Sequence, residues 1–516
     1  MPNRSTDALF LLVKSLEKSE KRNFKLYVKR NTAAEDLKII QLFDALDKLN
    51  DYDEKQLLKK SKSITKQQLS NIKAHLYKEL LSSLRIIKDE NNIDIRLHEQ
   101  MDYARILFNK GLYLQSLKIL DRLKETARTY NQLTYLQQAL FFEKKIETLY
   151  ITRSMQNRAE QLSAESDAVN HALTIVNQLS NLSLQLYSWY IKNGHARNEK
   201  DVSSIRSFFE NGLLADAKEA KGFYERLYLY QSYVWYAFIR QDFLNYYRYC
   251  QKWVNLFEEQ PAMLQVETAS YIKGMHNVMG AHFDLLNSNK LAENIQRFEL
   301  FTKTKLVKQN ENNLILAYQY LYTARINLCF LQGTFSKGLR MVPILEEMLK
   351  QYGTYLDTHR VLVFYYKIAC LYFGSGNNEK AIDYLNRIIN SKSDLRNDLQ
   401  CYARLLNLIA HYELGNFDLL EYLIKSVYRY MSKMENLSKV EEEIFVFLRR
   451  SFHVGAHALK PEFEKLLDKL KQYEGNSLET RAFAYLDIIS WLESKINNVN
   501  VQDVIREKFM QGRRGK

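Results

Sequence analysis

The chain has 516 residues, of which 46% are hydrophobic and 26% are charged, a composition typical of folded globular proteins that excludes an intrinsically disordered one. It contains only 4 prolines and 16 glycines. Because both residues break helices and β-rich proteins need many of them at turns, their scarcity predicts an all-α fold. The formal net charge of +14 permits an anionic partner without requiring one.

The N-terminal stretch is expected to form an amphipathic helix rather than a signal peptide. Its apolar run, residues 8–13, is short, and charged residues at helical spacing follow it without a small-residue cleavage site. No stretch of the chain approaches the ~20 apolar residues that a membrane span requires. The four cysteines are far apart and form no CxxC pair, which is typical of a reducing compartment. We therefore expect a cytoplasmic protein with no membrane partner.

Residues 1–95 are predicted to form a small N-terminal helical domain, with helices at about 6–29, 35–48, 53–61 and 64–88. Residues 55–88 hold nine basic residues and one acidic residue, so their net charge is 9 − 1 = +8. The short helix, the turn KSKSIT and the longer helix that starts near Thr65 resemble a helix-turn-helix over residues 53–88. Its candidate nucleic-acid contacts are polar and basic side chains: Lys59, Lys60, Lys62, Lys66, Gln67, Asn71 and Lys73.

A basic helical cap is the alternative for the same residues, and the sequence favours it. In that arrangement the lysines would face solvent, and an apolar face would be buried against the first repeat of the following domain: Leu69, Ile72, Leu76, Leu80 and Leu84. Lysine on a solvated face is common, and arginine, the commoner reader of bases, is scarce in this segment. Nucleic acid thus remains a possible partner through residues 53–88.

The clearest repeat lies in residues 365–389, YYKIACLYFGSGNNEKAIDYLNRII. Apolar and small residues follow helical spacing on both sides of the turn GSGNN: Tyr365, Ile368, Ala369 and Tyr372 before Gly376, and Ala381, Leu385 and Ile388 after it. This turn lacks the GxxxxGK[ST] and GxGxxG patterns of nucleotide-binding loops, and a helical period precedes it. The segment is therefore predicted to be a helical hairpin, closed by a glycine in the left-handed conformation.

The spacing in this hairpin resembles the tetratricopeptide repeat (TPR). Together with weaker copies, this hairpin gives turns near residues 241, 289, 333, 376 and 415, which are 48, 44, 43 and 39 residues apart, against a usual TPR period of about 34. The resemblance implies a right-handed α-solenoid of about nine TPR-like hairpins over residues 96–498. Residues 499–516 would then form a C-terminal helix end and a basic tail.

In proteins of the TPR family, the first helix of each hairpin lines a concave groove. Counting back from each turn, the resemblance implies partner-binding positions that are mostly aromatic: Trp235, Phe238, Tyr320, Asn327, Phe330, Tyr366, Phe373, Tyr402 and Tyr412. Aromatic side chains in a groove can anchor a peptide or a partner helix. Aromatic stripes at helical spacing also occur as ordinary core packing, so the pattern alone leaves both roles open.

No catalytic residue, metal site or cofactor is predicted. The chain lacks GxSxG, Cys–His and kinase signatures. His453 and His457 have the spacing of two ligands on one helical face, but Val454 stands where HExxH has its glutamate. The chemistry therefore favours a protein that is not an enzyme.

The most economical function is a non-enzymatic scaffold or adaptor that binds a protein or peptide segment in its concave groove. The alternative is a transcriptional regulator with DNA-binding N-terminal helices and a TPR-like sensor domain, a plan that resembles bacterial regulators joining a helix-turn-helix to TPRs. An enzyme accessory or inhibitor that acts through the N-terminal helices is a third hypothesis.

Overall fold

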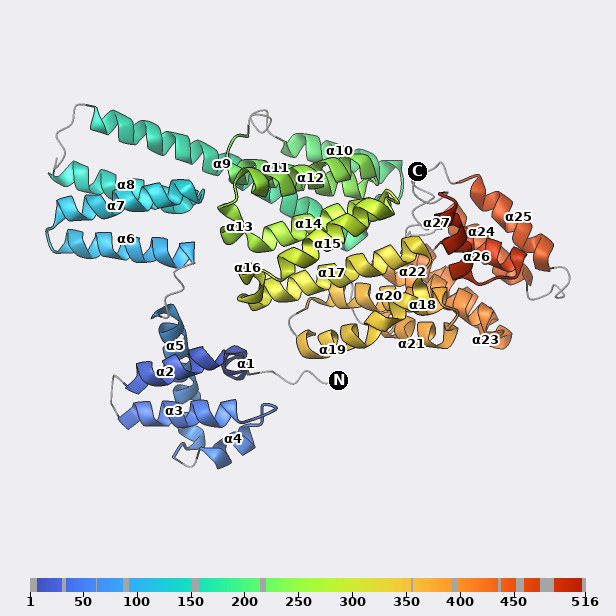
Figure 1. The fold of residues 1–516 in the computed structure, drawn as a ribbon, viewed down its shortest axis with the longest axis horizontal. Coiled ribbons are helices and arrows are strands. Elements are labelled where there is room, and N and C mark those ends of the chain that lie inside the picture. The colour runs from blue at the N-terminus through green and yellow to red at the C-terminus, as the bar shows by residue number, and fades with distance from the viewer. Residues whose placement is uncertain are drawn as a thin grey trace. The chain divides into compact units, whose positions relative to one another are not determined.

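The structure is a computed structural model. It describes residues 7–29, 34–61, 63–86, 92–150, 157–213, 220–353, 356–391, 397–434, 438–451, 459–473 and 487–512. Within these ranges the regular secondary structure is helical throughout and no strand occurs (Figure 1), which confirms the predicted all-α class. The packing divides the chain into two compact units, Met1–Leu120 and Asp121–Lys516. The domain boundaries expected near residues 95 and 498 stay predictions.

The first unit is a small helical bundle. Its helices are α1 (Ala8–Ser15), α2 (Lys18–Lys29), α3 (Ala34–Asp47), α4 (Glu54–Lys60), α5 (Lys66–Ile86), α6 (Ile93–Asn109) and the start of α7 (Tyr113–Thr129). Helix α5 packs against α2 and α3, and α3 also contacts α1 and α4. Phe24, Phe43, Leu46, Leu76 and Leu80 form the centre of the core and are fully buried.

The first predicted helix, residues 6–29, is two helices. Leu16 leaves the helical region with ψ of 136°, so α1 ends at Ser15. The carboxylate of Glu20 then accepts a hydrogen bond of 2.7 Å from the backbone N–H of Glu17, which satisfies one of the free donors at the start of α2. Polar residues at this point thus break a helix that the hydrophobic period alone would continue.

The second unit begins with the C-terminal half of α7, and a long series of helices follows. They are α8 (Leu133–Tyr150), α9 (Arg158–Asn193), α10 (Glu199–Gly212), α11 (Phe223–Ile239), α12 (Phe243–Glu259), α13 (Met263–Val266), α14 (Thr268–Asp284), α15 (Ser288–Thr302), α16 (Lys305–Lys308), α17 (Glu311–Gln332), α18 (Phe335–Gly338), α19 (Val342–Tyr352), α20 (Thr358–Gly374), α21 (Asn378–Ile389), α22 (Asn397–Glu413), α23 (Phe417–Lys433), α24 (Lys439–Ser451), α25 (Leu459–Lys471), α26 (Ile488–Asn497) and α27 (Val501–Met510).

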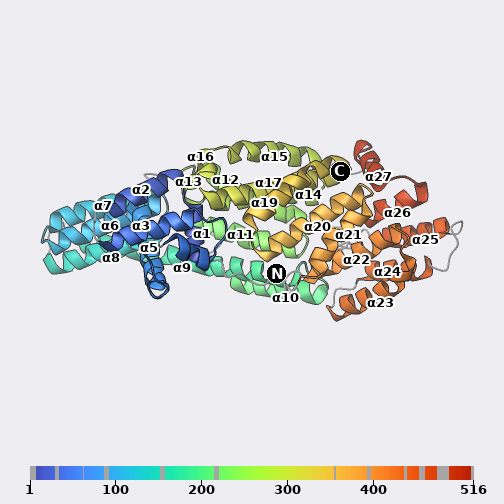
Figure 2. The same cartoon turned by 90° about the horizontal axis from the view of Figure 1, so that it is seen from below.

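Helices that follow one another in sequence lie side by side in this unit (Figure 2). Helix α11 packs on α12, α12 on α14, and α14 on α15 and α17; further along, α20 packs on α21 and α21 on α22. The apolar faces of these helices merge into two large cores, one centred on α11–α17 and one on α20–α27. Neighbouring helices therefore bury one another's apolar faces along the unit.

The predicted hairpin at residues 365–389 is confirmed. Helices α20 and α21 meet at Gly376, which has a φ of +87°, and the side chain of Asn377 accepts a hydrogen bond of 3.1 Å from the backbone N–H of Lys380. Positive φ also occurs at three of the other predicted turns, at Gln241, Gly333 and Gly415. The remaining turn is at Leu286 rather than Asn289. Asn289 lies inside α15, because the side chain of Asn287 caps that helix.

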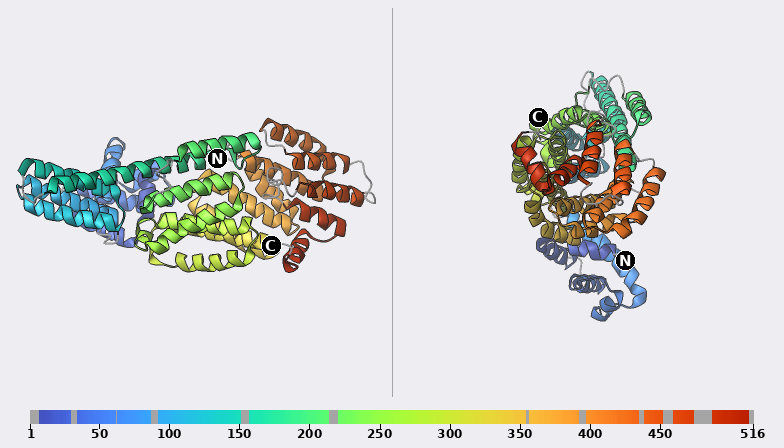
Figure 3. Two further views of the ribbon diagram at one scale, coloured as in Figure 1. Left: turned by 90° about the horizontal axis from the view of Figure 1, so that it is seen from above. Right: turned by 90° about the vertical axis from the view of Figure 1, so that its right-hand side faces the viewer.

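Segments far apart in the sequence also meet within this unit (Figure 3). Helix α9 contacts α22, and Gly194 lies so close to Asp398 that a Cβ atom there would be 2.9 Å from the carboxylate. Helix α17 contacts α27, and the hydroxyl of Ser336 donates a hydrogen bond of 2.8 Å to the amide oxygen of Gln502. These contacts connect distant parts of the series around the cavity described next.

Candidate functional site

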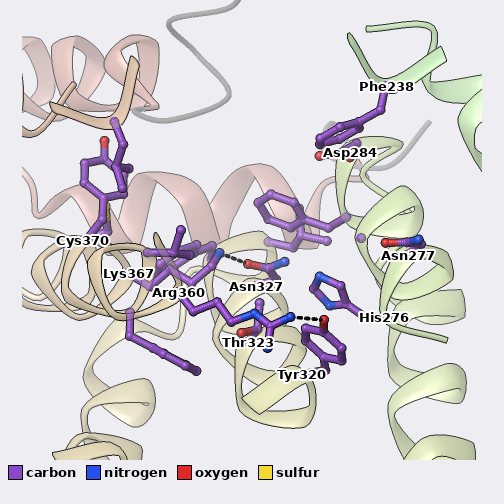
Figure 4. Close-up of a pocket in the computed structure, with 18 of the residues that line it drawn as sticks. Phe238, His276, Asn277, Asp284, Tyr320, Thr323, Asn327, Arg360, Lys367 and Cys370 are labelled. Carbon is purple, nitrogen blue, oxygen red and sulfur yellow. Dashed lines mark hydrogen bonds between the residues drawn. The ribbon is translucent and has the colours of Figure 1, made fainter. Parts of the chain in front are cut away.

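A cavity of about 820 Å³ lies inside the second unit (Figure 4). Residues of α9, α11, α14, α17 and α20 form its wall, and Val501 and Ile505 of α27 also line it. Its volume lies within the range of known ligand-binding sites.

Helices α14, α17 and α20 supply most of the polar groups. On α14, Lys273, His276, Asn277, Gly280 and Asp284 recur every three or four residues, so they share one helical face and line the cavity. Helix α17 adds Tyr320, Thr323 and Asn327, and α20 adds Arg360, Lys367 and Cys370. Because α17 packs against both α14 and α20, these three faces meet in one place.

Aromatic side chains of α9 and α11 form another part of the wall. Tyr187, Tyr190, Trp235 and Phe238 line it, and the rings of Tyr187 and Trp235 lie 4.7 Å apart. The ammonium of Lys273 lies 4.5 Å from the ring centre of Tyr187 and 5.2 Å from that of Trp235. These distances are within the range of cation–π attraction, which holds the Lys273 ammonium against the aromatic wall.

Hydrogen bonds and stacking fix His276 and the other two cations, Arg360 and Lys367 (Figure 4). The imidazole of His276 stacks on Tyr320, with ring centres 3.9 Å apart and planes inclined by 10°. The guanidinium of Arg360 donates to the Tyr320 hydroxyl at 3.4 Å. The ammonium of Lys367 donates to the amide oxygen of Asn327 at 2.5 Å. Each cation is thereby held in a defined position before any ligand arrives.

Burial changes the protonation of these groups. It lowers the pKa of Lys273 to about 8, with a further contribution from Arg360, and it lowers the pKa of Lys367 to about 8, against the opposing effects of Cys370 and Asp284. The pKa of His276 falls to about 3, because burial and then the charges of Lys367, Arg360 and Lys273 oppose its protonation. His276 is therefore neutral at pH 7.

The acidic and thiol groups of the wall shift in the opposite direction. Burial raises the pKa of Asp284 to about 7, although Lys367 acts to lower it. Burial also raises the pKa of Cys370 to about 12, so its sulfur is a thiol at neutral pH. As a whole, the wall carries three cationic side chains, Lys273, Arg360 and Lys367, and two carboxyl groups, those of Asp284 and Asp487.

Carboxylates compensate the three cations unequally. The carboxylate of Asp357 pairs with the Nε of Arg360 at 2.9 Å, and Asp284 acts on Lys367. Lys273 has no ion pair among the residues that the structure describes. In the same part of the chain, the amide nitrogen of Asn277 has no hydrogen-bond partner, and the residue is only 4% exposed. Lys273 therefore lines the cavity without a counter-charge from the described residues, whereas the amide nitrogen of Asn277 is shielded from solvent.

Seven of the nine predicted groove residues line this cavity: Trp235, Phe238, Tyr320, Asn327, Phe330, Tyr366 and Phe373. The other two lie in the hydrophobic core: Tyr402 is 1% exposed, and Tyr412 packs against Phe447 and Trp491. Whether the seven contact a partner stays a prediction, since Trp235, Tyr320, Tyr366 and Phe373 are largely buried by their neighbours.

The repeat positions counted back from each turn did not include four polar residues of the cavity: Lys273, His276, Arg360 and Lys367. A signal for Lys367 was present, because it is the single charged residue in the apolar stretch VLVFYYKIACLYF of α20. Lys273 similarly lies between Ile272 and Met275, which are both fully buried. A lone charge in a buried helix points to a polar cavity more directly than the aromatic residues around it do.

The candidate nucleic-acid residues belong to the first unit and do not form a uniform set. Lys59, Lys60, Lys66, Gln67 and Asn71 are exposed on α4 and the first half of α5.

Lys73 instead has internal partners. Its ammonium pairs with the carboxylate of Asp7 and donates to the Tyr52 hydroxyl at 2.8 Å. Lys62 lies outside the described residues. Nucleic-acid binding by the exposed residues of α4 and α5 stays a prediction.

His453 and His457 also lie outside the described residues. In the part of the chain that the structure describes, no group of three or more His, Cys, Asp or Glu side chains is placed to hold a metal ion. None of the described helices combines the length and the hydrophobicity needed to span a bilayer.

Neither a scan against protein-family models nor a search of curated proteins returns a match for this chain. The site therefore has to be interpreted from its own residues.

Proposed function

We propose that the second unit is a right-handed α-solenoid of TPR-like hairpins, and that the protein is a cytoplasmic, non-enzymatic scaffold or adaptor that binds a segment of a partner protein. The observation that carries this proposal is the composition of the cavity wall. Helices α11, α14, α17 and α20 each turn one face toward the same cavity, and α11, α14 and α20 each pack against the helix that follows in sequence, α12, α15 and α21. The first helices of a series of hairpins line the concave side in this way.

The chemistry of the wall supports binding rather than catalysis. A cysteine nucleophile needs its thiolate, and the raised pKa of Cys370 keeps it protonated. A histidine base works best with a pKa near the working pH, and the pKa of His276 is about 3. Aromatic rings, amides and fixed cations remain, and these groups recognise a ligand without transforming it.

The cavity suits a short segment rather than a folded domain. A volume of about 820 Å³ holds a chain end or a few side chains. The half-buried ring of Phe238 offers a rigid contact area for apolar groups, the edge of Trp235 lines the same wall, and Thr323 offers a hydroxyl. A partner would therefore insert a peptide end or a loop tip.

Affinity capture with a matched pair of variants tests this proposal. Thr323→Tyr adds a ring inside the cavity, and Tyr422→Ala removes a 68% exposed ring on α23 as the control. The segment of a captured partner is then synthesised and titrated into purified protein. We expect Thr323→Tyr to weaken its binding at least tenfold and Tyr422→Ala to leave it unchanged; equal binding by both variants would contradict the proposal.

A regulator that binds DNA is the second candidate, and the exposure of Lys59, Lys60 and Lys66 beside Gln67 and Asn71 favours it. The start of a helix carrying such side chains can enter the major groove. A gel-shift series with the full chain at decreasing salt tests this candidate. Salt-sensitive binding that weakens in Lys59→Met/Lys60→Met supports it, and no binding even at low salt removes it.

A further inference from the structure

The ammonium of Lys273 is buried without a counter-charge among the described residues. Its ammonium lies inside the cavity, against Tyr187 and Trp235, and none of the described carboxylates pairs with it. The charge of Arg360 also acts on it unfavourably. Removing a charge from water costs several kcal/mol unless an opposite charge replaces the lost hydration. The cavity wall therefore lacks a counter-charge at this position.

The number of missing charges follows from the ionisable groups that face one another. Lys273, Arg360 and Lys367 contribute +3, and the Asp357 carboxylate on Arg360 contributes −1, so the sum is 3 − 1 = +2 before the carboxylates that line the cavity are counted. These are Asp284 and Asp487, and the Asp487 carboxylate accepts hydrogen bonds from the backbone N–H and the hydroxyl of Ser490. Asp284 titrates near pH 7, and an anion in the same cavity would favour its protonated, neutral form. The wall thus matches a ligand with two negative charges.

We propose that the cavity binds a phosphate monoester, with its oxygens held by Lys273, Arg360 and Lys367. This inference rests on the proposed function, because the partner segment is the carrier of the phosphoryl group. The three cations come from two helices, α14 and α20, that both contact α17, and all three act on His276. The neutral His276 and its partner Tyr320 lie between these helices (Figure 4).

A phosphate monoester fits this wall better than a carboxylate does. It carries nearly two negative charges at pH 7 and three strong acceptor oxygens, whereas a carboxylate carries one charge and two oxygens. A single carboxylate would leave one buried cation without a counter-charge. Trp235 and Phe238 would pack against an apolar or aromatic carrier, because their rings line the same cavity.

Calorimetric titration of the full chain at pH 7 tests the inference with three probes of similar shape: phenyl phosphate, benzoate and phenol. We expect phenyl phosphate to bind at least tenfold more tightly than benzoate, and phenol to give no measurable heat. In Lys273→Met the affinity for phenyl phosphate should fall at least tenfold, while Lys59→Met, with its exposed site on α4, should bind as the wild type does. Thermal unfolding verifies that both variants are folded.

A short peptide with a phosphotyrosine at its centre separates this inference from the proposed function. Binding of the peptide and of phenyl phosphate, both lost in Lys273→Met, supports the two together. Binding of phenyl phosphate without the peptide keeps the phosphate site but contradicts a chain segment as its carrier. Equal affinity for phenyl phosphate and benzoate, or none for either, overturns the phosphate site, and the capture experiment with Thr323→Tyr still decides the proposed function.

Discussion

Two groups of lysines lie in opposite surroundings. One group is on α4 and α5, and the other is on α14 and α20. Lys59, Lys60 and Lys66 are exposed, so water hydrates and salt screens their charges. Lys273 and Lys367 line an internal cavity, and burial lowers the pKa of each to about 8. The first group contributes to the +8 charge of residues 55–88 that stands out in the sequence, whereas the second group is buried and has more to gain from a counter-charge.

This difference shows why net charge is a poor guide to binding sites. An exposed lysine costs little in the free protein and gains little from a single partner charge. A buried lysine without a counter-charge destabilises the free protein, and a ligand that supplies the charge removes that cost. The buried cations would thus lower the stability of the free protein and raise the affinity of the cavity for an anionic ligand.

The largest expected effect in stability is that of Lys273→Met. At about 1.4 kcal/mol per pKa unit, the fall from 10.5 to about 8 corresponds to roughly 3 kcal/mol of destabilisation at pH 7. The lost cation–π contacts with Tyr187 and Trp235 offset part of it. We expect Lys273→Met to raise the free energy of unfolding by about 2 kcal/mol, measured by urea denaturation.

The contrast between the two groups would fail if Lys273→Met destabilised the protein, since the charge would then have a favourable partner. Lys59→Met is the matched control, and as a change on an exposed surface it should stay within about 0.5 kcal/mol of the wild type.

A change of pH tests the same charge through its protonation. The pKa of Lys273 is lower in the folded protein than in the unfolded chain. The unfolded chain therefore binds more protons at this residue between about pH 8 and pH 10.5. The contribution of Lys273 to stability therefore rises with pH in this window and is constant below it. The advantage of Lys273→Met over the wild type should shrink by about 1–2 kcal/mol between pH 7 and pH 9.5, in parallel urea titrations.

Other groups of the cavity also titrate, and the paired measurement removes their effect. Asp284 has a pKa raised to about 7, so its contribution to stability falls as pH rises from about 4 to 7 and is constant above that. Lys367 titrates in the same window as Lys273 but is present in both proteins. An advantage of Lys273→Met that does not change with pH would contradict the assignment to the Lys273 ammonium.

Lys73 provides an intermediate case within the first unit. Burial opposes its charge, but the Asp7 carboxylate and the Tyr52 hydroxyl outweigh burial and raise its pKa. We expect Lys73→Met to lower the free energy of unfolding by about 1 kcal/mol, the opposite sign to Lys273→Met, because Asp7 loses its partner. A stabilising effect of Lys73→Met in the same denaturation assay would show that the presence of a carboxylate does not explain the difference between the lysines.

The smallest effect is expected for Asn277→Leu. Its amide nitrogen has no hydrogen-bond partner among the described residues, so a leucine of similar size should leave the free energy of unfolding within about 1 kcal/mol of the wild type. Affinity for phenyl phosphate should also stay unchanged, because this nitrogen is shielded from solvent. A severalfold loss of affinity in the calorimetric titration would show instead that the nitrogen contacts the phosphate.

Sequence patterns predicted the helices and turns better than they predicted the cavity. The scarcity of proline and glycine predicted an all-α chain, and Gly333, Gly376 and Gly415 are at turns as their spacing indicated. Local signals suffice there, since a left-handed residue and an N-cap lie within a few positions of each other. The break at Leu16 was missed because the apolar period continues through it.

The cavity depends on contacts that no local pattern contains. Trp235 and Tyr320 were predicted from their positions before the turns, but so were Tyr402 and Tyr412, which lie in the core. Position along a helix predicts which face a residue occupies, whereas the contacts of α9 with α22 and of α17 with α27 depend on the arrangement of the whole unit.

The most direct test of the central claim is a crystal structure with 4-bromophenyl phosphate, supplied near its dissociation constant and measured at the bromine absorption edge. We predict a bromine peak inside the cavity beside Trp235, with phosphate oxygens within hydrogen-bond distance of Lys273 and Arg360. A cavity without bromine, or a phosphate bound only on the outer surface in crystals of protein that binds the compound in solution, would contradict it.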